Sequence, residues 1–464
     1  MWHERALPDL GNNIKCGNSL IGPDYFAGQL LPDEDAMRRI NPFDWKTEFP
    51  EIMKVGGFDA VIGNPPWGAD LSEGERHFLV QQYATVPEKT KDSYMYFLVR
   101  SLSLTRPLGI LGFIVPNTWL LINTASQFRR ELLSLSVKEI IDHGDGVFKK
   151  ATVESSTLIV SKHPDVDGMC HAIRMRRGVP VVNRLAKKQV WLADEFCRIL
   201  IDLDDKAQQL LTKLKSKSVP FRECCVIIWG IKPYQVGYGT PPQSREMIEK
   251  RIYHSEVKKG EPWKPLVVGS NVNRYELNYS GNHYIKYGKW LMYPSNESLM
   301  LQPKILLRQT SDVLRACYDE NGYYCQNSVF IIHSDNVNLK VLLGLLNSRL
   351  FGYVYRLGNP QTGKIFAEIK PSVIKELPIR AFDLREAKGR SQQDRIVKLV
   401  ERMMDLHKQL VAGRMPDDRN RVQRQIDATD REIDRLVYDL YGLTEEEIAI
   451  VEGRAVASGR VSIA

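Results

Sequence analysis

The fold of the first half of the chain follows from one stretch, Phe58-Asp59-Ala60-Val61-Ile62-Gly63-Asn64-Pro65-Pro66-Trp67. Its pattern predicts a short buried strand at residues 60–62 that stops at a glycine and two prolines. Proline fixes φ and has no N–H to give to a sheet, so the strand ends here in a rigid turn. Ligands of open α/β sheets bind at the carboxyl ends of the strands. We therefore expect a ligand site at residues 64–67.

The side chains of this turn suit a planar amino group. The Asn64 amide oxygen and the Pro65 carbonyl are two acceptors that can point to one place. Such a pair can orient an amine and partly pyramidalise it before its lone pair attacks. Trp67 offers a flat face on which a ring can stack, and the exocyclic amine of a nucleobase fits all three contacts. The alternative is a strand-terminating turn with a buried tryptophan and no ligand.

The stretch resembles the catalytic motif of amino-group methyltransferases that use S-adenosyl-L-methionine, above all the N6-adenine DNA methyltransferases. The resemblance implies that Asn64, Pro65 and Pro66 form the catalytic turn, in which Asn and the first Pro bind the adenine amino group. It also implies that Trp67 stacks on the base flipped out of the duplex, although the family more often has Tyr there. The same motif serves enzymes that methylate glutamine amides in proteins, so other parts of the chain must decide the substrate.

Two further site residues follow from the same resemblance. In the family, the junction matching residues 144–153 carries a Phe that stacks on the other face of the flipped base, and Phe148 matches it. Residues 13–20 are expected to form a short strand that ends in a turn, where the family places an Asp or Asn near the adenine of the cofactor. Asn18 is thus a candidate cofactor-binding residue. The alternatives are a core Phe at a strand edge and an ordinary turn Asn.

Strands and helices alternate along residues 1–165, which predicts a doubly wound, Rossmann-like α/β sheet. We expect this segment to be the C-terminal part of a methyltransferase catalytic domain. Residues 68–92 are polar and are expected to form a loop beside the catalytic edge. The expected strands are 58–63, 109–115, 137–142 and 157–160, and the expected helices are 33–40, 93–104 and 128–133.

The resemblance also implies a part that these residues do not supply. The family binds the methionine end of its cofactor with a Gly-rich loop upstream of the catalytic motif. In this sequence 63 residues precede Asn64, and no Gly-x-Gly follows an apolar strand among them. The sheet is therefore expected to be partial, and an upstream polypeptide is expected to complete the methyltransferase fold.

The composition is that of an ordinary soluble globular protein, with 43% hydrophobic and 26% charged residues over 464 positions. This length predicts about two to four domains. The net charge of +8 is compatible with a polyanionic partner such as DNA. Seven cysteines without a C-x-x-C indicate free thiols in a reducing cytoplasm. No apolar run approaches the length of a membrane span, and no pattern suggests a metal.

Residues 185–380 show short apolar segments cut by glycine and proline, which is typical of an α+β domain. Several of their stretches resemble the TaqI-like C-terminal specificity domain of type IIG restriction–modification enzymes. The resemblance implies a target-recognition domain that forms one wall of a DNA cleft and reads the site in the major groove. The stretches are 264–269, 303–310, 323–332, 342–350 and 369–379.

Three other segments complete the expected domain plan. Residues 163–190 carry a run of Arg and Lys and are expected to be a boundary, either a solvated linker or a phosphate contact. Residues 390–445 place apolar side chains at helical spacing in two segments, which predicts a C-terminal helical hairpin. Residues 446–464 are expected to be a tail, with a disordered stretch at Gly-Arg-Ala-Val-Ala-Ser-Gly, residues 453–459.

The two resemblances together imply a site-specific, adenine-specific DNA methyltransferase of a restriction–modification or phage-defence system. It would transfer a methyl group from S-adenosyl-L-methionine to adenine N6 in double-stranded DNA. Two alternatives stay open. One is a catalytically inactive DNA-binding fragment or subunit that lacks the cofactor loop. The other is an enzyme that methylates a protein glutamine, which has no use for a specificity domain of this size.

Overall fold

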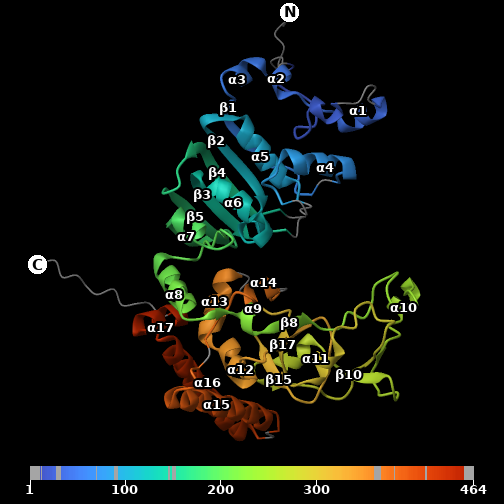
Figure 1. Cartoon of the computed structure of the whole chain (residues 1–464), viewed down its shortest axis with the longest axis vertical. Coiled ribbons are helices and arrows are strands. Elements are labelled where there is room, and N and C mark those ends of the chain that lie inside the picture. Colours follow the sequence, from blue (N-terminus) through green and yellow to red (C-terminus); the bar gives the residue numbers. More distant parts are fainter. Residues whose placement is uncertain are drawn as a thin grey trace, which may run out of the picture. The chain divides into compact units, whose positions relative to one another are not determined.

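The computed structural model describes residues 11, 13–27, 33–68, 70–87, 92–144, 147–148, 153–359, 367–380, 382–412 and 415–453. The chain divides into two compact units, Met1–Asp205 and Lys206–Ala464 (Figure 1). Each unit encloses hydrophobic core of its own, because the buried apolar residues cluster within one unit or the other.

The first unit is built on a six-stranded sheet, whose strands are β1 (Phe58–Gly63), β2 (Thr105–Pro116), β3 (Leu135–Gly144), β4 (Ser155–Pro164), β5 (Met169–Arg176) and β6 (Val179–Lys187). Their order in the sheet is β1-β2-β4-β3-β5-β6. β1, β2, β3 and β5 run in one direction, and β4 and β6 run against them. Four of the six strands thus share one direction, and the predicted Rossmann-like α/β sheet is confirmed.

Helices cover one face of this sheet. Neighbouring strands set apolar side chains side by side along it, as in the buried row Leu111, Val160 and Val137. α5 (Tyr94–Leu104) and α6 (Ser126–Leu133) pack their apolar sides into the same core. The other helices described in this unit are η1 (Pro23–Phe26), α1 (Glu34–Ile40), α2 (Trp45–Glu48), α3 (Pro50–Lys54), α4 (Glu73–Gln82), η2 (Asn117–Leu120), η3 (Asn123–Ala125) and α7 (Lys188–Leu192).

The opposite face is open at both edge strands. Ile62 of β1 is 91% exposed and Leu185 of β6 is 65% exposed, although both side chains are large and apolar. Within the described residues β1 pairs only with β2, so its outer edge presents unpaired N–H and C=O groups. The prediction that residues 60–62 are buried is therefore wrong. An apolar run looks the same in a central strand and in a strand that lacks one neighbour.

Residues 163–190 were expected to be a boundary, either a solvated linker or a phosphate contact, but they contain the last two strands of the sheet. β5 pairs parallel with β3, and β6 pairs antiparallel with β5. The first unit therefore ends at Asp205 and not near residue 165. Basic residues of this segment are in part structural: Arg174 is buried and pairs with Asp142 at 3.6 Å and with Asp202 at 3.1 Å. Composition cannot distinguish such internal pairs from a solvated charge run.

Two local predictions also differ from the structure. Residues 13–20 form bends and turns instead of a strand. Within the described chain, their strand-like pairing is limited to one isolated bridge between Asn18 and Pro42. Residues 68–92 contain α4 as well as loop. The sequence carries a signal for this helix, because Ser72 and Glu75 form a capping box at its start.

The second unit has the predicted α+β character. One sheet has the order β15-β14-β17-β8 and another the order β16-β10-β13-β9. The strands of the first are β8 (Val226–Trp229), β14 (Lys304–Arg308), β15 (Ala316–Asp319) and β17 (Val329–His333). Those of the second are β9 (His254–Ser255), β10 (Trp263–Val267), β13 (Tyr284–Lys286) and β16 (Tyr324–Cys325). Two short ladders join β7 (Val219–Pro220) to β18 (Pro378–Ile379) and β11 (Val272–Asn273) to β12 (Glu276–Leu277).

The predicted helical hairpin is α15 (Ala387–Ala412) and α16 (Pro416–Tyr441), and it shares a core with β14 and β17. α12 (Leu339–Asn347) packs against α15 so closely that a Cβ on Gly344 would lie 3.2 Å from Val400. α17 (Glu445–Glu452) occupies part of the predicted tail, and residues 454–464 lie outside the described chain. The other helices described here are α8 (Asp205–Ser216), α9 (Phe221–Cys224), α10 (Arg245–Glu249), η4 (Gly269–Asn271), α11 (Glu297–Leu301), α13 (Arg349–Gly358) and α14 (Pro371–Ile374).

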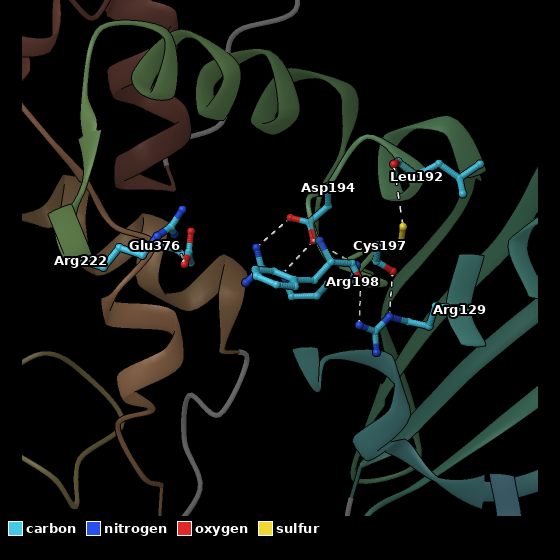
Figure 2. A network of polar contacts seen from close by, with 8 residues as sticks. Arg129, Leu192, Asp194, Cys197, Arg198, Arg222 and Glu376 are labelled. Atoms are coloured by element: carbon cyan, nitrogen blue, oxygen red, sulfur yellow. Dashed lines mark hydrogen bonds and ion pairs between the residues drawn. The ribbon is translucent and has the colours of Figure 1, made fainter. Parts of the chain in front are cut away.

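One buried cation ties the loops of the first unit together. Arg129 of α6 is fully buried, and its guanidinium donates to the carbonyls of Trp119 at 2.5 Å, Phe196 at 2.7 Å and Cys197 at 2.9 Å. Figure 2 shows Arg129 pointing at the turn that carries Cys197 and Arg198. Burial lowers the pKa of Arg129 to about 10, which still leaves it charged at neutral pH.

Replacing Arg129 by Met should destabilise the first unit by about 3 kcal/mol, because three buried carbonyls lose their donor. Thermal unfolding followed by circular dichroism measures this loss. Arg130→Met is the matched control, since Arg130 is the next residue of α6 and is exposed. Equal melting temperatures for the two variants would contradict the structural role of Arg129.

Candidate active site

The turn after β1 is fixed by one hydrogen bond from a helix start. β1 ends at Gly63, and the Pro66 carbonyl accepts a hydrogen bond of 2.7 Å from the Ser93 hydroxyl. Ser93 is fully buried and directly precedes α5. The next residue, Tyr94, shares a 3.0 Å hydrogen bond with the Thr118 hydroxyl in η2, and burial raises the pKa of Tyr94. The start of α5 therefore links the turns that follow β1 and β2.

The two acceptors predicted at this turn differ in their partners. The Asn64 Oδ1 accepts a hydrogen bond of 3.1 Å from the Trp67 indole Nε1. In the described part of the chain, no hydrogen bond reaches the Pro65 carbonyl. Asn64 is exposed while Pro65 is buried, so the side chain faces solvent from a fixed backbone. The Pro65 carbonyl thus has no hydrogen-bond donor among the described residues, and the Asn64 Oδ1 keeps one lone pair for a ligand.

The structure brings the two predicted stacking residues together. The Trp67 and Phe148 rings have centroids 5.1 Å apart and planes at 84°, an edge-to-face contact. Trp67 precedes β2 and Phe148 follows β3 in the sequence, so the contact is made only in the folded chain. A base held between two aromatic faces needs those faces parallel and wider apart. One ring must therefore turn before a base can lie between them.

A polar network missed by sequence reasoning lies at the same edge of the sheet. Asn117, directly after β2, donates from Nδ2 to Asp142 at 2.9 Å and to Glu154 at 3.0 Å. Arg174 approaches the buried Asp142 to 3.6 Å. These contacts join the end of β2, the end of β3 and the residue before β4, and so fix both ends of the junction that carries Phe148. The sequence contains a signal for this network. Asn117 directly follows the proline that ends β2, just as Asn64 directly follows β1.

Asn18 lies in a turn of its own. Its Oδ1 accepts from the Leu20 backbone N–H at 3.2 Å, and its backbone pairs with Asn41 and Pro42. Among the described residues, none of these contacts reaches the turn at Asn64. The described chain also holds no group of three His, Cys, Asp or Glu side chains arranged for a metal ion. No described helix has the length and apolarity needed to cross a membrane.

Two parts of the chain match known protein families. Residues 3–148 match the Eco57I restriction-modification methylase family, and residues 264–379 match the TaqI-like C-terminal specificity domain. These two ranges contain the turn at Asn64, Phe148 and most of the strands of the second unit.

Relatives and solved structures agree with these matches. The chain is 27% identical over 340 residues to RM.MjaORFECS2P of Methanocaldococcus jannaschii, which is assigned as a type II restriction enzyme and methyltransferase. This alignment covers 70% of this chain and 27% of that protein. It is 31% identical over 163 residues to the type II restriction enzyme and methyltransferase RM.Eco57I of Escherichia coli, over 34% of this chain and 15% of that protein. The chain thus spans about a quarter or less of these relatives.

A likeness in fold extends over both units. The structure of the type IIL restriction-modification enzyme MmeI in complex with DNA superposes with a TM-score of 0.53 at 11% identity, covering 89% of this chain and 58% of that one.

Ser93→Ala should loosen the turn at residues 64–67 with little loss of overall stability, about 1 kcal/mol for one hydrogen bond. Hydrogen–deuterium exchange of a peptide that begins at Trp67 should become faster, because the Pro66 carbonyl loses its anchor. Ser103→Ala is the control, since Ser103 is exposed on the same helix and its hydroxyl donates to the Arg100 carbonyl in the preceding turn. Unchanged exchange in Ser93→Ala would show that the prolines alone hold the turn.

Proposed function

Since residues 3–148 are a restriction-modification methylase region and residues 264–379 a TaqI-like specificity domain, we propose that the chain acts in site-specific methylation of DNA within a restriction–modification system. The methyl group comes from S-adenosyl-L-methionine and goes to N6 of adenine. One observation carries this proposal: the Asn64 Oδ1 and two aromatic rings meet at one turn on the carboxyl edge of the sheet, and the Pro65 carbonyl of that turn accepts no hydrogen bond from the described residues. An amino group on an aromatic base is the ligand with matching donors and a matching face.

The residues of the chain act on the target base. An adenine flipped out of the duplex stacks on Trp67, with Phe148 on its other side after the Phe148 ring turns, so that Trp67 keeps its hydrogen bond to Asn64. Its two amino hydrogens point to the Asn64 Oδ1 and the Pro65 carbonyl, which leaves the nitrogen lone pair aimed away from the turn. Stacking contributes about 1–3 kcal/mol per base, comparable with the cost of unstacking it. S-adenosyl-L-methionine, when bound, would supply an electrophilic methyl group for that nitrogen.

The described residues fit the target half of this reaction better than the cofactor half. Asn18 is the one candidate cofactor residue from the sequence, and its side chain caps its own turn. β1 has an unpaired outer edge with Ile62 91% exposed. Exposed apolar edge strands are completed in native proteins by a further strand or a cover. This supports an upstream polypeptide, in the same chain or a second one, that adds strands beside β1 and carries the cofactor loop.

Double-stranded DNA is the proposed partner of the second unit. The specificity-domain match lies there, and the net charge of the chain is +8. Direct readout would come from side chains that reach base edges in the major groove. A restriction–modification role also implies a cytoplasmic location, where the DNA lies. Methylation of a protein glutamine is the weaker proposal, since it gives no function to the region of more than a hundred residues that matches the TaqI-like specificity domain.

An inactive DNA-binding subunit is the second candidate function. It is favoured by the turn-capping contact of Asn18, which leaves the described chain without an evident cofactor cradle. The two candidates differ in one measurable property, the binding of S-adenosyl-L-methionine.

Asn64→Ala in the complete enzyme should reduce methylation by more than about tenfold, or 1.4 kcal/mol in the barrier, because one of two amine acceptors is lost. Transfer of a labelled methyl group to DNA measures the rate, and a gel shift measures DNA binding, which should stay nearly unchanged. Asn13→Ala, on an exposed part of the same unit, is the control. A rate above a tenth of the parent rate would remove Asn64 from the proposed role.

Calorimetric titration of S-adenosyl-L-methionine tests the proposed completion of the sheet. We expect weak or no binding to the 464-residue chain and tight binding once the upstream polypeptide is added in cis or in trans. Ile62→Lys should block this gain without unfolding the chain, because the side chain is exposed in the chain alone. Val55→Lys, at a 72% exposed position beside α3, is the matched control. Equal, tight binding to both forms would overturn the proposal.

A further inference from the structure

The hydrogen bond between Trp67 and Asn64 has a direction that chemistry fixes. An indole Nε1–H can only donate, whereas an asparagine side chain has an oxygen that accepts and a nitrogen that donates. The 3.1 Å contact therefore requires the Asn64 Oδ1, and not the Nδ2, to lie on the Trp67 side of the turn. No other hydrogen bond of the described chain holds the Asn64 amide, so this one sets its orientation.

Trp67 is itself well placed to act as a fixed reference. Its ring packs edge-to-face on Phe148, and the residue before it is anchored by Ser93 through the Pro66 carbonyl. A side chain held at its ring and at its backbone loses little further entropy when its N–H bonds to Asn64. The orientation of the Asn64 amide thus depends on contacts from α5 and from the junction between β3 and β4.

This orientation decides whether the turn can accept an amine. With Oδ1 in place, its second lone pair and the Pro65 carbonyl face the two amino hydrogens. With the amide flipped, an NH₂ group would face another NH₂ group, and donors would meet donors. We propose that Trp67 is a positioning residue for Asn64: its indole N–H selects the amide orientation that accepts the target amine. The proposal rests on the proposed function and adds a role for Trp67 beyond stacking.

The contact can be tested without any activity, by NMR of the 464-residue chain with ¹⁵N-labelled tryptophan. The chain has 8 Trp, and loss of one indole signal in Trp67→Phe assigns Trp67. Asn64→Ala should shift that signal and speed its exchange with solvent. Asn64→Asp should keep it protected, because a carboxylate accepts from either oxygen. The Trp45 indole, which donates to the Ser19 carbonyl at 3.2 Å, is the internal control. An unshifted Trp67 signal in Asn64→Ala overturns the proposal.

The role in catalysis needs a variant that keeps the ring and loses only the donor. Trp67→3-benzothienylalanine replaces the N–H by sulfur in a bicyclic ring of nearly the same shape. In the complete enzyme we expect kcat to fall about fivefold, as for loss of one neutral hydrogen bond, while KM for DNA stays unchanged. A role in stacking alone would leave both constants at their parent values, and that result overturns the proposal. Absence of methylation by the parent enzyme would overturn the proposed function itself, even with the NMR contact present.

Discussion

The parallel pairing of β1 with β2 is the constraint on which the candidate site depends. It sets Gly63 opposite Phe113, so the chain must leave the sheet level with the last residues of β2. The two prolines prevent the strand from continuing, and the Ser93 hydroxyl donates to the carbonyl of the second proline, Pro66. Asn64, Trp67 and, through the β3–β4 junction, Phe148 then meet at one edge because four of the strands point the same way. The common direction of these strands therefore determines which residues can meet at the site, and the side chains determine what they can bind.

Sequence reasoning succeeded where a short stretch contains its own physical cause. The turn at residues 64–67 was predicted because two prolines end a strand in any context. The contact of Trp67 with Phe148 also fits the prediction that both serve one ligand, although their roles stay predictions. Strand positions in the first unit were close, since β2, β3 and β4 begin and end within about five residues of the predicted bounds.

What the sequence could not reveal depends on partners distant along the chain. Asn117 and Asp142 are 25 residues apart, and their contact exists only because β4 lies between β2 and β3 and pairs with both. Strands β5 and β6 were not predicted, because their run of Arg and Lys suits a solvated linker or a phosphate contact until carboxylate partners such as those of Arg174 are known. The exposure of Ile62 could not be predicted for the same reason, because no local pattern shows whether a strand has one neighbouring strand or two.

The close approach of Gly344 to Val400 has a consequence for gene exchange. The helical hairpin and the sheet of β14 and β17 fill one core, and a side chain at position 344 would push α12 away from α15. A crossover within residues 264–412 would therefore join two halves of a core that had never been packed together. A crossover near Asp205 leaves every core whole. Recombination between related genes should move the second unit as a single block that includes its C-terminal helices.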